Sequence, residues 1–242
     1  MPLNAHGQPI GDPLPGWEPR RPPGPVVLEG TRCRVEPLDP ARHAADLHAA
    51  YRSAPDDRDW TYLTAGPFAT AADYRAWADG ASRSADPRHY AVVATDSGQA
   101  VGTLALMRQD PAHGVIEVGG IAFSPPMRRS PLSTEAQFLL MSYVFDTLGY
   151  RRYEWKCDSL NAPSRAAAER LGFTFEGVFR QAVVYKGRNR DTAWYSLLDR
   201  EWPAAKRAFR TWLAPANHTP DGRQIQPLAA LRTPGTRTAT EG

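Results

Sequence analysis

Residues 115–148 read VIEVGGIAFSPPMRRSPLSTEAQFLLMSYVFDTL, and this stretch decides the fold. Its first part, 115–123, is rich in β-branched and aromatic residues and too short for a typical helix, so it predicts a buried strand. Pro125 and Pro126 end that strand, because proline cannot donate to a β-ladder. An apolar helix follows, with Ser130 as its N-cap and Pro131 at its first position.

The start of this helix is a predicted anion-binding site. A helix N-terminus leaves unpaired amides and about half a positive charge facing outward, which suits a phosphate. Arg128 and Arg129 add two guanidinium groups there. Two arginines in a loop are often only solvated surface. Their position at a helix start, after a buried strand, favours a diphosphate site instead.

Length and composition limit the class of protein. The chain has 242 residues, of which 42% are hydrophobic, enough for one large or two small domains with a core. No apolar run approaches the roughly 18 residues of a membrane span. The formal charge of +3 favours anionic ligands over a dedicated nucleic-acid surface. Cys33 and Cys157 give neither a disulfide framework nor metal-ligand spacing, so we expect a cytoplasmic protein without a metal.

The chain divides into an arm, a domain and a tail. Residues 1–30 hold eight prolines and five glycines and cannot propagate a helix or a central strand. Trp17 is expected to pin this arm to the domain. Residues 31–213 form one domain's worth of sequence, and residues 214–242 are expected to be a flexible C-terminal tail.

The rest of the domain alternates strands and helices. The parallel step in the sheet is predicted between 115–123 and the strand 153–157, because a crossover helix joins them. The other strands are expected at 32–38, 89–95 and 100–108, with a closing hairpin of 173–185 and 192–198. Helices are expected at 40–52, 70–82, 162–171 and 202–213, with Asp39, Thr70 and Asn161 as the caps of the first three.

This order of elements resembles the GNAT acyl-CoA-dependent N-acetyltransferases. Residues 161–173, NAPSRAAAERLGF, followed by 176–180, EGVFR, are similar to the RimJ/RimL-type branch. The resemblance implies an α/β (α+β) GNAT-like fold, a mixed and mostly antiparallel seven-stranded sheet flanked by helices. It also implies an enzyme that moves an acetyl group from acetyl-CoA to a primary amine, on a protein N-terminus or a small molecule. Dimers are common among the relatives, so a homodimer is compatible with it, whereas membrane and nucleic-acid partners are not expected.

The resemblance also assigns residues to acetyl-CoA. The backbone of the central strand would pair with the pantetheine amides, and an N–H near Gly120 to Ala122 would polarise the thioester carbonyl. The family's phosphate loop usually reads Arg/Gln-x-x-Gly-x-Gly/Ala, and both glycines are missing here, so hydroxyl groups and arginines would substitute. The residues expected to bind acetyl-CoA are Ile121, Ala122, Phe123, Arg128, Arg129, Ser130, Ser133, Thr134 and Asn161.

The sequence leaves two alternatives for each candidate catalytic residue. Glu117, the one charge on the central strand, is either the general base or a carboxylate paired with an arginine. Many relatives carry a tyrosine that acts as the general acid at the position of Ala168. Ser164 is therefore a candidate general acid here, or else its hydroxyl bonds the helix backbone. Asn161 caps its helix and is also placed on the pantetheine arm. Because the loop glycines and the tyrosine are missing, a catalytically weak CoA-binding or sensor protein of the same fold is the alternative function.

Overall fold

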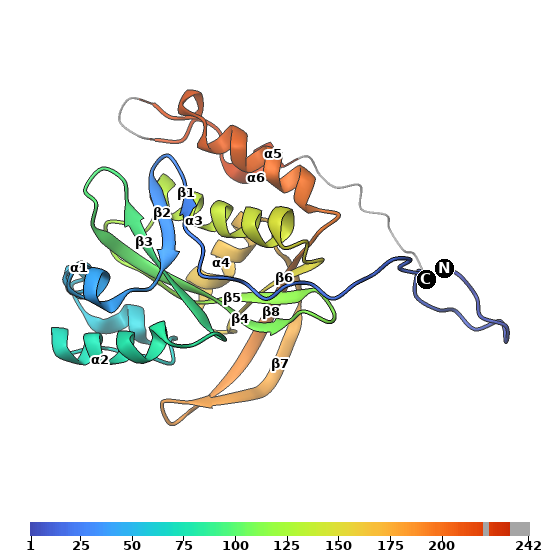
Figure 1. The fold of residues 1–242 in the computed structure, drawn as a ribbon, viewed down its shortest axis with the longest axis horizontal. Helices are drawn as coiled ribbons and strands as arrows, with labels where there is room; N and C mark the ends of the chain where they lie inside the picture. Colours follow the sequence, from blue (N-terminus) through green and yellow to red (C-terminus); the bar gives the residue numbers. More distant parts are fainter. Residues whose placement is uncertain (220–222, 233–242) are drawn as a thin grey trace.

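The computed structural model describes residues 1–219 and 223–232. Its eight-stranded sheet has the order β1-β2-β3-β4-β5-β6-β8-β7, with helices on both faces (Figure 1). The strands are β1 (Leu28–Glu29), β2 (Cys33–Pro37), β3 (Arg88–Ala94), β4 (Ala100–Asp110), β5 (Val115–Phe123), β6 (Arg152–Asp158), β7 (Thr174–Tyr185) and β8 (Arg188–Leu198). The α-helices are α1 (Pro40–Arg52), α2 (Ala71–Ser82), α3 (Pro131–Ser142), α4 (Ala162–Leu171), α5 (Trp202–Leu213) and α6 (Leu228–Leu231).

The predicted mixed, mostly antiparallel sheet is confirmed, but it has one strand more than expected. All neighbouring strands are antiparallel except β5 and β6, which form the predicted parallel step. The expected seven strands become eight, because Leu28 and Glu29 pair with Val35 and Arg34 of β2. These two residues lie in the proline-rich arm, and a two-residue strand carries no period-two pattern that a sequence could reveal.

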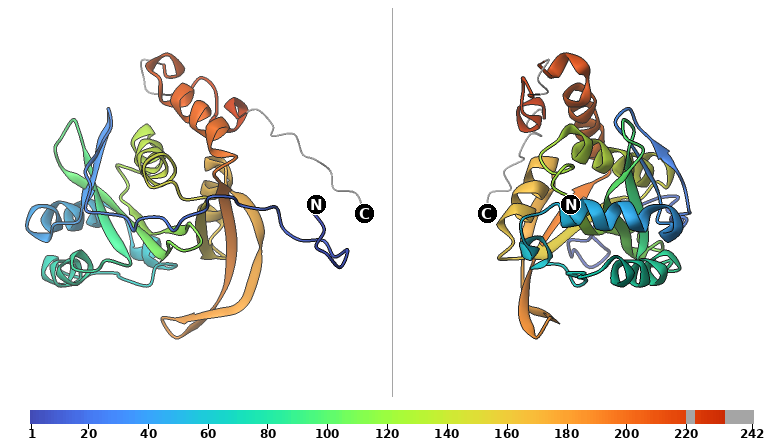
Figure 2. Two further views of the ribbon diagram at one scale, coloured as in Figure 1. Left: turned by 45° about the vertical axis from the view of Figure 1, so that its right-hand side comes forward. Right: turned by 90° about the vertical axis from the view of Figure 1, so that its left-hand side faces the viewer.

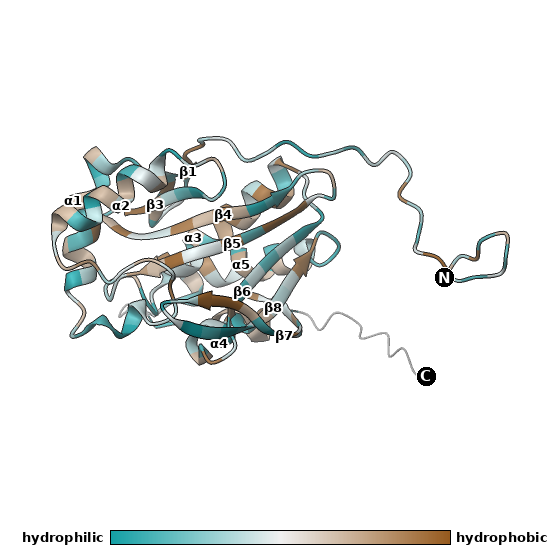
Figure 3. Cartoon of the chain, turned by 90° about the horizontal axis from the view of Figure 1, so that it is seen from below, coloured by the Kyte–Doolittle hydropathy of each residue, from teal (hydrophilic) through white to brown (hydrophobic). Residues whose placement is uncertain are grey.

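The core lies in two layers on either side of the sheet. Along β3, Tyr90 and Val92 join the larger cluster with α3, α4 and α5, whereas Ala91 and Val93 join the smaller one with α1 and α2. This alternation follows the period of two of a strand buried on both faces. Figure 2 shows α3 and α5 on one side of the sheet and α1 with α2 on the other, and hydrophobic residues follow the central strands β4 and β5 in Figure 3.

The predicted caps of α1, α2 and α4 are formed. Asp39 accepts a hydrogen bond from the Ala41 amide, and Asn161 accepts one from the Ser164 amide. Thr70 and Asp73 form a reciprocal capping box at the start of α2. The helix that follows the loop was expected to run to Leu148. Instead, α3 ends at Ser142 and is followed by a π-helical turn, Tyr143–Thr147.

The closing hairpin turns more tightly than predicted. The sequence predicted a longer connection, around 186–190, but the strands are joined by Lys186 and Gly187 alone. Both residues have positive φ, +49° and +70°, as a type I′ turn requires. The start of β8 was not predicted because Arg188 and Arg190 are charged and typical of a loop. The hairpin extends beyond the rest of the sheet (Figure 2).

Both terminal segments contact the domain in the part that the structure describes. The Trp17 indole donates to the Ala112 carbonyl at 2.9 Å, which confirms its expected contact with the domain. In the C-terminal segment, Leu228 of α6 is buried and Arg232 donates to the Glu169 carbonyl. The division into arm, domain and tail at residues 30 and 213 stays a prediction. None of the described helices is long and apolar enough to cross a membrane.

Candidate active site

Strands β5 and β6 pair over part of their length and then separate. The pairing joins residues 115–118 to residues 152–155, whereas β5 continues to Phe123 and β6 to Asp158. Beyond Val118 no described strand pairs with this edge of β5. Its backbone N–H and C=O groups are therefore available to another extended chain.

A β-bulge lies where the two strands separate. The β4–β5 register shifts after Gly119, so that Gly120 and Ile121 together oppose one residue of β4. Gly120 has a φ of +57°, a left-handed conformation that glycine adopts without steric cost. The Tyr51 hydroxyl, from α1, donates to the Ala122 carbonyl at 3.0 Å and fixes the bulge from one face of the sheet.

Helix α3 begins just beyond β5 with its first amides uncapped. Ser130 occupies the predicted N-cap position, but its hydroxyl donates to the Met127 carbonyl at 2.6 Å, and no side chain caps the helix. The side-chain cap expected of Ser130 is therefore absent, because the hydroxyl turns back into the preceding loop. The free amides keep their capacity to bind an anion at the end of the open strand edge.

Comparisons with known proteins identify this arrangement. A GCN5-related N-acetyltransferase from Brucella melitensis is 52% identical, with a TM-score of 0.88 over 90% of this chain and 99% of that one. A probable acetyltransferase (GNAT family) from Chromobacterium violaceum ATCC 12472 is 44% identical, with a TM-score of 0.75 over 81% and 98%. Residues 32–174, more than half of the chain, match the model of the acetyltransferase (GNAT) domain. The chain belongs to the GNAT family.

The chain is also similar to a relative whose name refers to the ribosome. "Putative ribosomal N-acetyltransferase YdaF" of Bacillus subtilis (strain 168) is 31% identical over 109 residues, which are 45% of this chain and 59% of that protein. The match therefore spans about three fifths of that relative's length. The predicted GNAT resemblance, of the RimJ/RimL-like branch, is confirmed.

The GNAT family uses acetyl-CoA, and the donor groups of this chain fit that substrate. The unpaired edge of β5 at Ile121, Ala122 and Phe123 suits the amides of a pantetheine arm, since amide groups pair with a strand edge. The uncapped start of α3, with Arg128 and Arg129 in the loop before it, suits a diphosphate. These contacts are not tested by the structure and stay predictions.

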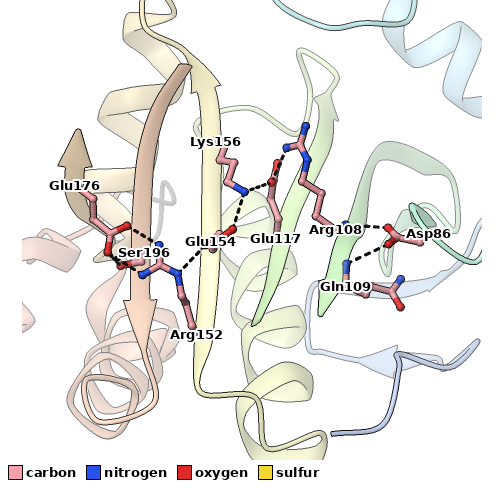
Figure 4. A network of polar contacts seen from close by, with 9 residues as sticks. All are labelled: Asp86, Arg108, Gln109, Glu117, Arg152, Glu154, Lys156, Glu176 and Ser196. Atoms are coloured by element: carbon pink, nitrogen blue, oxygen red, sulfur yellow. Dashed lines mark hydrogen bonds and ion pairs between the residues drawn. The ribbon is translucent and has the colours of Figure 1, made fainter. Parts of the chain in front are cut away.

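Glu117, the predicted general base of this GNAT protein, is buried and forms ion pairs with the half-exposed Arg108 and the buried Lys156 (Figure 4). Its carboxylate accepts from Arg108 Nη1 at 2.7 Å and lies 3.1 Å from Lys156 Nζ, with 4% of the side chain exposed. Lys156 also contacts Glu154 at 2.7 Å and lies 3.7 Å from the centre of the Trp194 ring. The ion pair that stood as the alternative for Glu117 is therefore formed, and its role as a base stays a prediction.

The same network continues towards β7 (Figure 4). Arg152 contacts Glu154 at 2.6 Å and both carboxylate oxygens of Glu176, at 2.8 Å and 2.5 Å. Hydrogen bonds from Arg152 hold the pKa of Glu176 below its ordinary value. Ser196 of β8 donates to Glu176 at 2.7 Å. Cations and carboxylates thus alternate across the strands, so the buried charges compensate one another next to the separating strands.

Ser164 and Asn161 lie at the start of α4, beside the end of β6. The Ser164 hydroxyl accepts a hydrogen bond from the Trp155 indole at 3.0 Å, and Trp155 is the last β6 residue that pairs with β5. The hydroxyl therefore lies near the point of separation, where a general acid is required, and that role stays a prediction. Burial raises the pKa of the nearby Cys157 thiol, which does not favour a reactive thiolate.

The phosphate-loop side chains differ in how far they are engaged. Arg128 forms an ion pair with Asp59, whereas Arg129 has no hydrogen bond or ion pair to any residue of the described ranges. The Ser133 hydroxyl donates to the Ser130 carbonyl at 2.8 Å, inside the first turn of α3. Arg129 is therefore the arginine of this loop without a partner among the described residues, and its contact with a phosphate stays a prediction.

Thr134 occupies a different environment from the other loop residues. It is 1% exposed, and its hydroxyl accepts a hydrogen bond from Arg170 of α4 at 3.0 Å. Burial lowers the pKa of Arg170, which also lies 4.9 Å from the Trp212 ring. Thr134 thus joins α3 to α4, and its predicted contact with acetyl-CoA stays untested.

Residues 57–66, here called the bridging segment, connect two sides of the site. Asp59 pairs with Arg128 before α3, as described above. At the next two residues, Lys186 of the β7–β8 turn donates to the Trp60 carbonyl at 2.8 Å, and Arg188 donates to the Thr61 carbonyl at 2.7 Å. Trp60 packs edge-on against Tyr51, with the ring centres 5.1 Å apart. The segment therefore contacts both the phosphate loop and the hairpin, and it packs against α1 through Trp60.

Several of these residues carry only weak signals in the sequence. Glu154 and Lys156 alternate with buried residues, so the period of two predicts a shared polar face, but not the pairing with Glu117. The contacts of Asp59 with Arg128 and of Tyr51 with Ala122 join residues about seventy positions apart. No spacing rule within one element reveals contacts over that separation.

Proposed function

We propose that this GNAT protein transfers the acetyl group of acetyl-CoA to a primary amine on a protein N-terminus or a small molecule. One observation carries the proposal. Strand β5 leaves β6 after Val118, at a glycine bulge, and its open edge leads to the uncapped N-terminus of α3. An open strand edge pairs with the pantetheine amides, a backbone N–H at the bulge polarises the thioester carbonyl, and a helix N-terminus binds the diphosphate.

The backbone of the bulge is the proposed site of carbonyl polarisation. An N–H group aimed at the thioester oxygen stabilises the charge that develops when the amine attacks. Because the bulge is held by glycine and by the Tyr51 hydroxyl, the donor is fixed before substrate binds. Such preorganisation lowers the barrier without a change in shape during the reaction.

The acceptor is proposed to approach from the α1–α2 side. On the opposite side, Ile116 and Val118 of β5 are buried in the same hydrophobic cluster as Ala136 and Leu140 of α3. The bridging segment and the hairpin lie at the α1–α2 side, and both the N-terminal amine of a peptide and a small amine fit an approach from there. The name of the relative YdaF, which refers to the ribosome, supports a protein N-terminus as one acceptor to test.

Two measurements test the proposal. Isothermal titration with acetyl-CoA is expected to show saturable binding, and the release of free thiol is expected to depend on an added amine. The amines are short peptides with free N-termini, the same peptides with blocked N-termini, and polyamines. Thiol release with free but not blocked peptides supports the protein N-terminus. Binding without thiol release from any amine supports the CoA-binding or sensor alternative, which the buried Ala168 in place of a tyrosine favours.

A further inference from the structure

His89 of β3 lies beside the bulge of β5. His89 pairs across the strands with Ala105, and Ala105 pairs with Gly119, so the three positions form one row on one face of the sheet. A Cβ atom added to Gly120 would lie 3.7 Å from His89 Cε1. Since alanine and glycine fill the row on β4 and β5, the imidazole is next to the backbone where the strands separate.

The row faces the α1–α2 side, from which the acceptor amine is proposed to approach. Ala91 and Val93, which share the face of His89 by the period of two, pack in the cluster formed with α1 and α2. Trp77 of α2 lies edge-on to the imidazole, with ring centres 5.6 Å apart and an interplanar angle of 82°. This contact holds the half-buried ring in place.

The imidazole has an unused polar atom. His89 Nδ1 is buried and forms no hydrogen bond with the residues that the structure describes. A buried polar atom without a partner costs free energy, so its presence at a site asks for a functional reason. Burial lowers the pKa of His89 from 6.5, so the ring is neutral at pH 7 and able to accept a proton.

The surroundings of His89 differ from those of Glu117. The groups packed on the imidazole from α2, β4 and β5 are Trp77, Ala105 and Gly120, and none of them titrates. Further along β4 and β5, Arg108 and Glu117 pair with each other. The guanidinium group of Arg108 and the ammonium group of Lys156 both contact Oε2 of Glu117, so this oxygen already has two charged partners, whereas His89 Nδ1 has none among the described residues.

We infer that His89 is the general base of the acetyl transfer, an inference that rests on the proposed function. The amine nitrogen bonds to the thioester carbonyl carbon while its proton moves to the imidazole, directly or through one water molecule. The carbon–sulfur bond then breaks, and the imidazolium returns the proton to the leaving thiolate. The products are the acetylated amine and the thiol of CoA, and His89 is neutral again.

The experiment compares His89→Gln with His48→Gln as a matched control. His48 is also a half-buried histidine whose Nε2 is buried without a partner among the described residues, but its ring lies against Tyr74 of α2. We expect His89→Gln to lower kcat by about a hundredfold or more, the usual effect of removing a general base. The fall of log kcat towards acid, present in the wild type and in His48→Gln, is expected to disappear.

Chemical rescue provides a second readout that a structural role would not move. Imidazole added to His89→Ala is expected to restore turnover in proportion to its concentration, and not to affect His48→Ala. Acetyl-CoA binding by titration is expected to be unchanged in all four variants, which shows that they fold. If His89→Gln keeps kcat within threefold of the wild type together with its acid limb, the inference is overturned. Absence of turnover in the wild type with every amine overturns the proposed function instead.

Discussion

Arg128 of the phosphate loop forms an ion pair with Asp59 of the bridging segment, so a residue expected to bind a phosphate already has a carboxylate partner. Phosphate and carboxylate compete for one guanidinium group. Binding of acetyl-CoA through Arg128 must therefore displace Asp59, and part of the binding free energy is used for that exchange.

Asp59→Asn is expected to tighten acetyl-CoA binding by about two- to fivefold, the strength of an exposed ion pair. The measurement is isothermal titration at low salt, where the effect is largest. Asp57→Asn is the matched control, because Asp57 is an exposed acid of the same turn with no ion pair to the described residues. Equal changes in the two variants would contradict the competition and leave a general charge effect.

Arg129→Ala is expected to weaken acetyl-CoA binding by about tenfold, since it removes a charge-assisted hydrogen bond that no protein group replaces. Arg128→Ala is expected to cost less, because Arg128 is already paired. Titration with CoA and with dephospho-CoA separates the phosphates. A larger loss for CoA than for dephospho-CoA places the arginine at the 3′-phosphate, and equal losses place it at the diphosphate.

Gly120→Ala is expected to lower turnover, because the left-handed backbone of the bulge costs a side-chain residue about 1–2 kcal/mol. The added methyl group itself has room, with its nearest neighbours 3.7 Å away. Gly98→Ala is the matched control, since Gly98 has a φ of +70° and open space in the β3–β4 turn. The two variants are expected to lose similar stability by urea unfolding, and turnover falls in Gly120→Ala alone. Similar turnover in both would remove the bulge from the mechanism.

Glu117→Gln is expected to lower the free energy of unfolding by roughly 2 kcal/mol, because it weakens hydrogen bonds to two cations in a buried network. Urea unfolding measures this loss. Glu29→Gln, at an exposed acid of β1, is expected to have little effect. If Glu117→Gln instead keeps its stability and loses turnover, the carboxylate acts as the base.

Glu176→Gln is expected to flatten the dependence of stability on pH at the acid side. The folded pKa of Glu176 is lowered by the hydrogen bonds from Arg152, so its contribution is present above the ordinary value of 4.5 and is lost as the pH falls through the folded value. Urea unfolding between pH 6 and pH 3, on the wild type and the variant, measures the difference. Parallel curves would show that the ion pair does not stabilise the fold.

The sequence predicted most elements of the fold because each carries a local signal. Each of these signals depends only on residues of the same helix or strand. They are the caps Asp39, Thr70 and Asn161 and the apolar stretch of β5, and all are found where expected. The short strand β1 and the two-residue turn at Lys186 were missed. One carries too few residues for a pattern, and the other has a lysine where a type I′ turn usually has asparagine.

The candidate site was predictable in its backbone and less so in its side chains. The open edge of β5 and the start of α3 follow from the order of strand, loop and helix. The partners of the side chains depend on contacts between distant elements: Lys156 with Glu117, Asp59 with Arg128, and His89 with the bulge. No period or motif links these positions, so the sequence left the choice between base and ion pair open for Glu117.

The hairpin reaches the bridging segment through main-chain carbonyls, at Trp60, Thr61 and Ala65, and not through side chains of that segment. An anchor of this kind does not depend on which side chain stands at Thr61 or Ala65. Relatives can therefore vary these two positions during evolution, and so reshape the surface that meets an acceptor, while Lys186 and Arg188 hold the loop in the same place. Divergence in acceptor choice without loss of the scaffold is the expected outcome of this design.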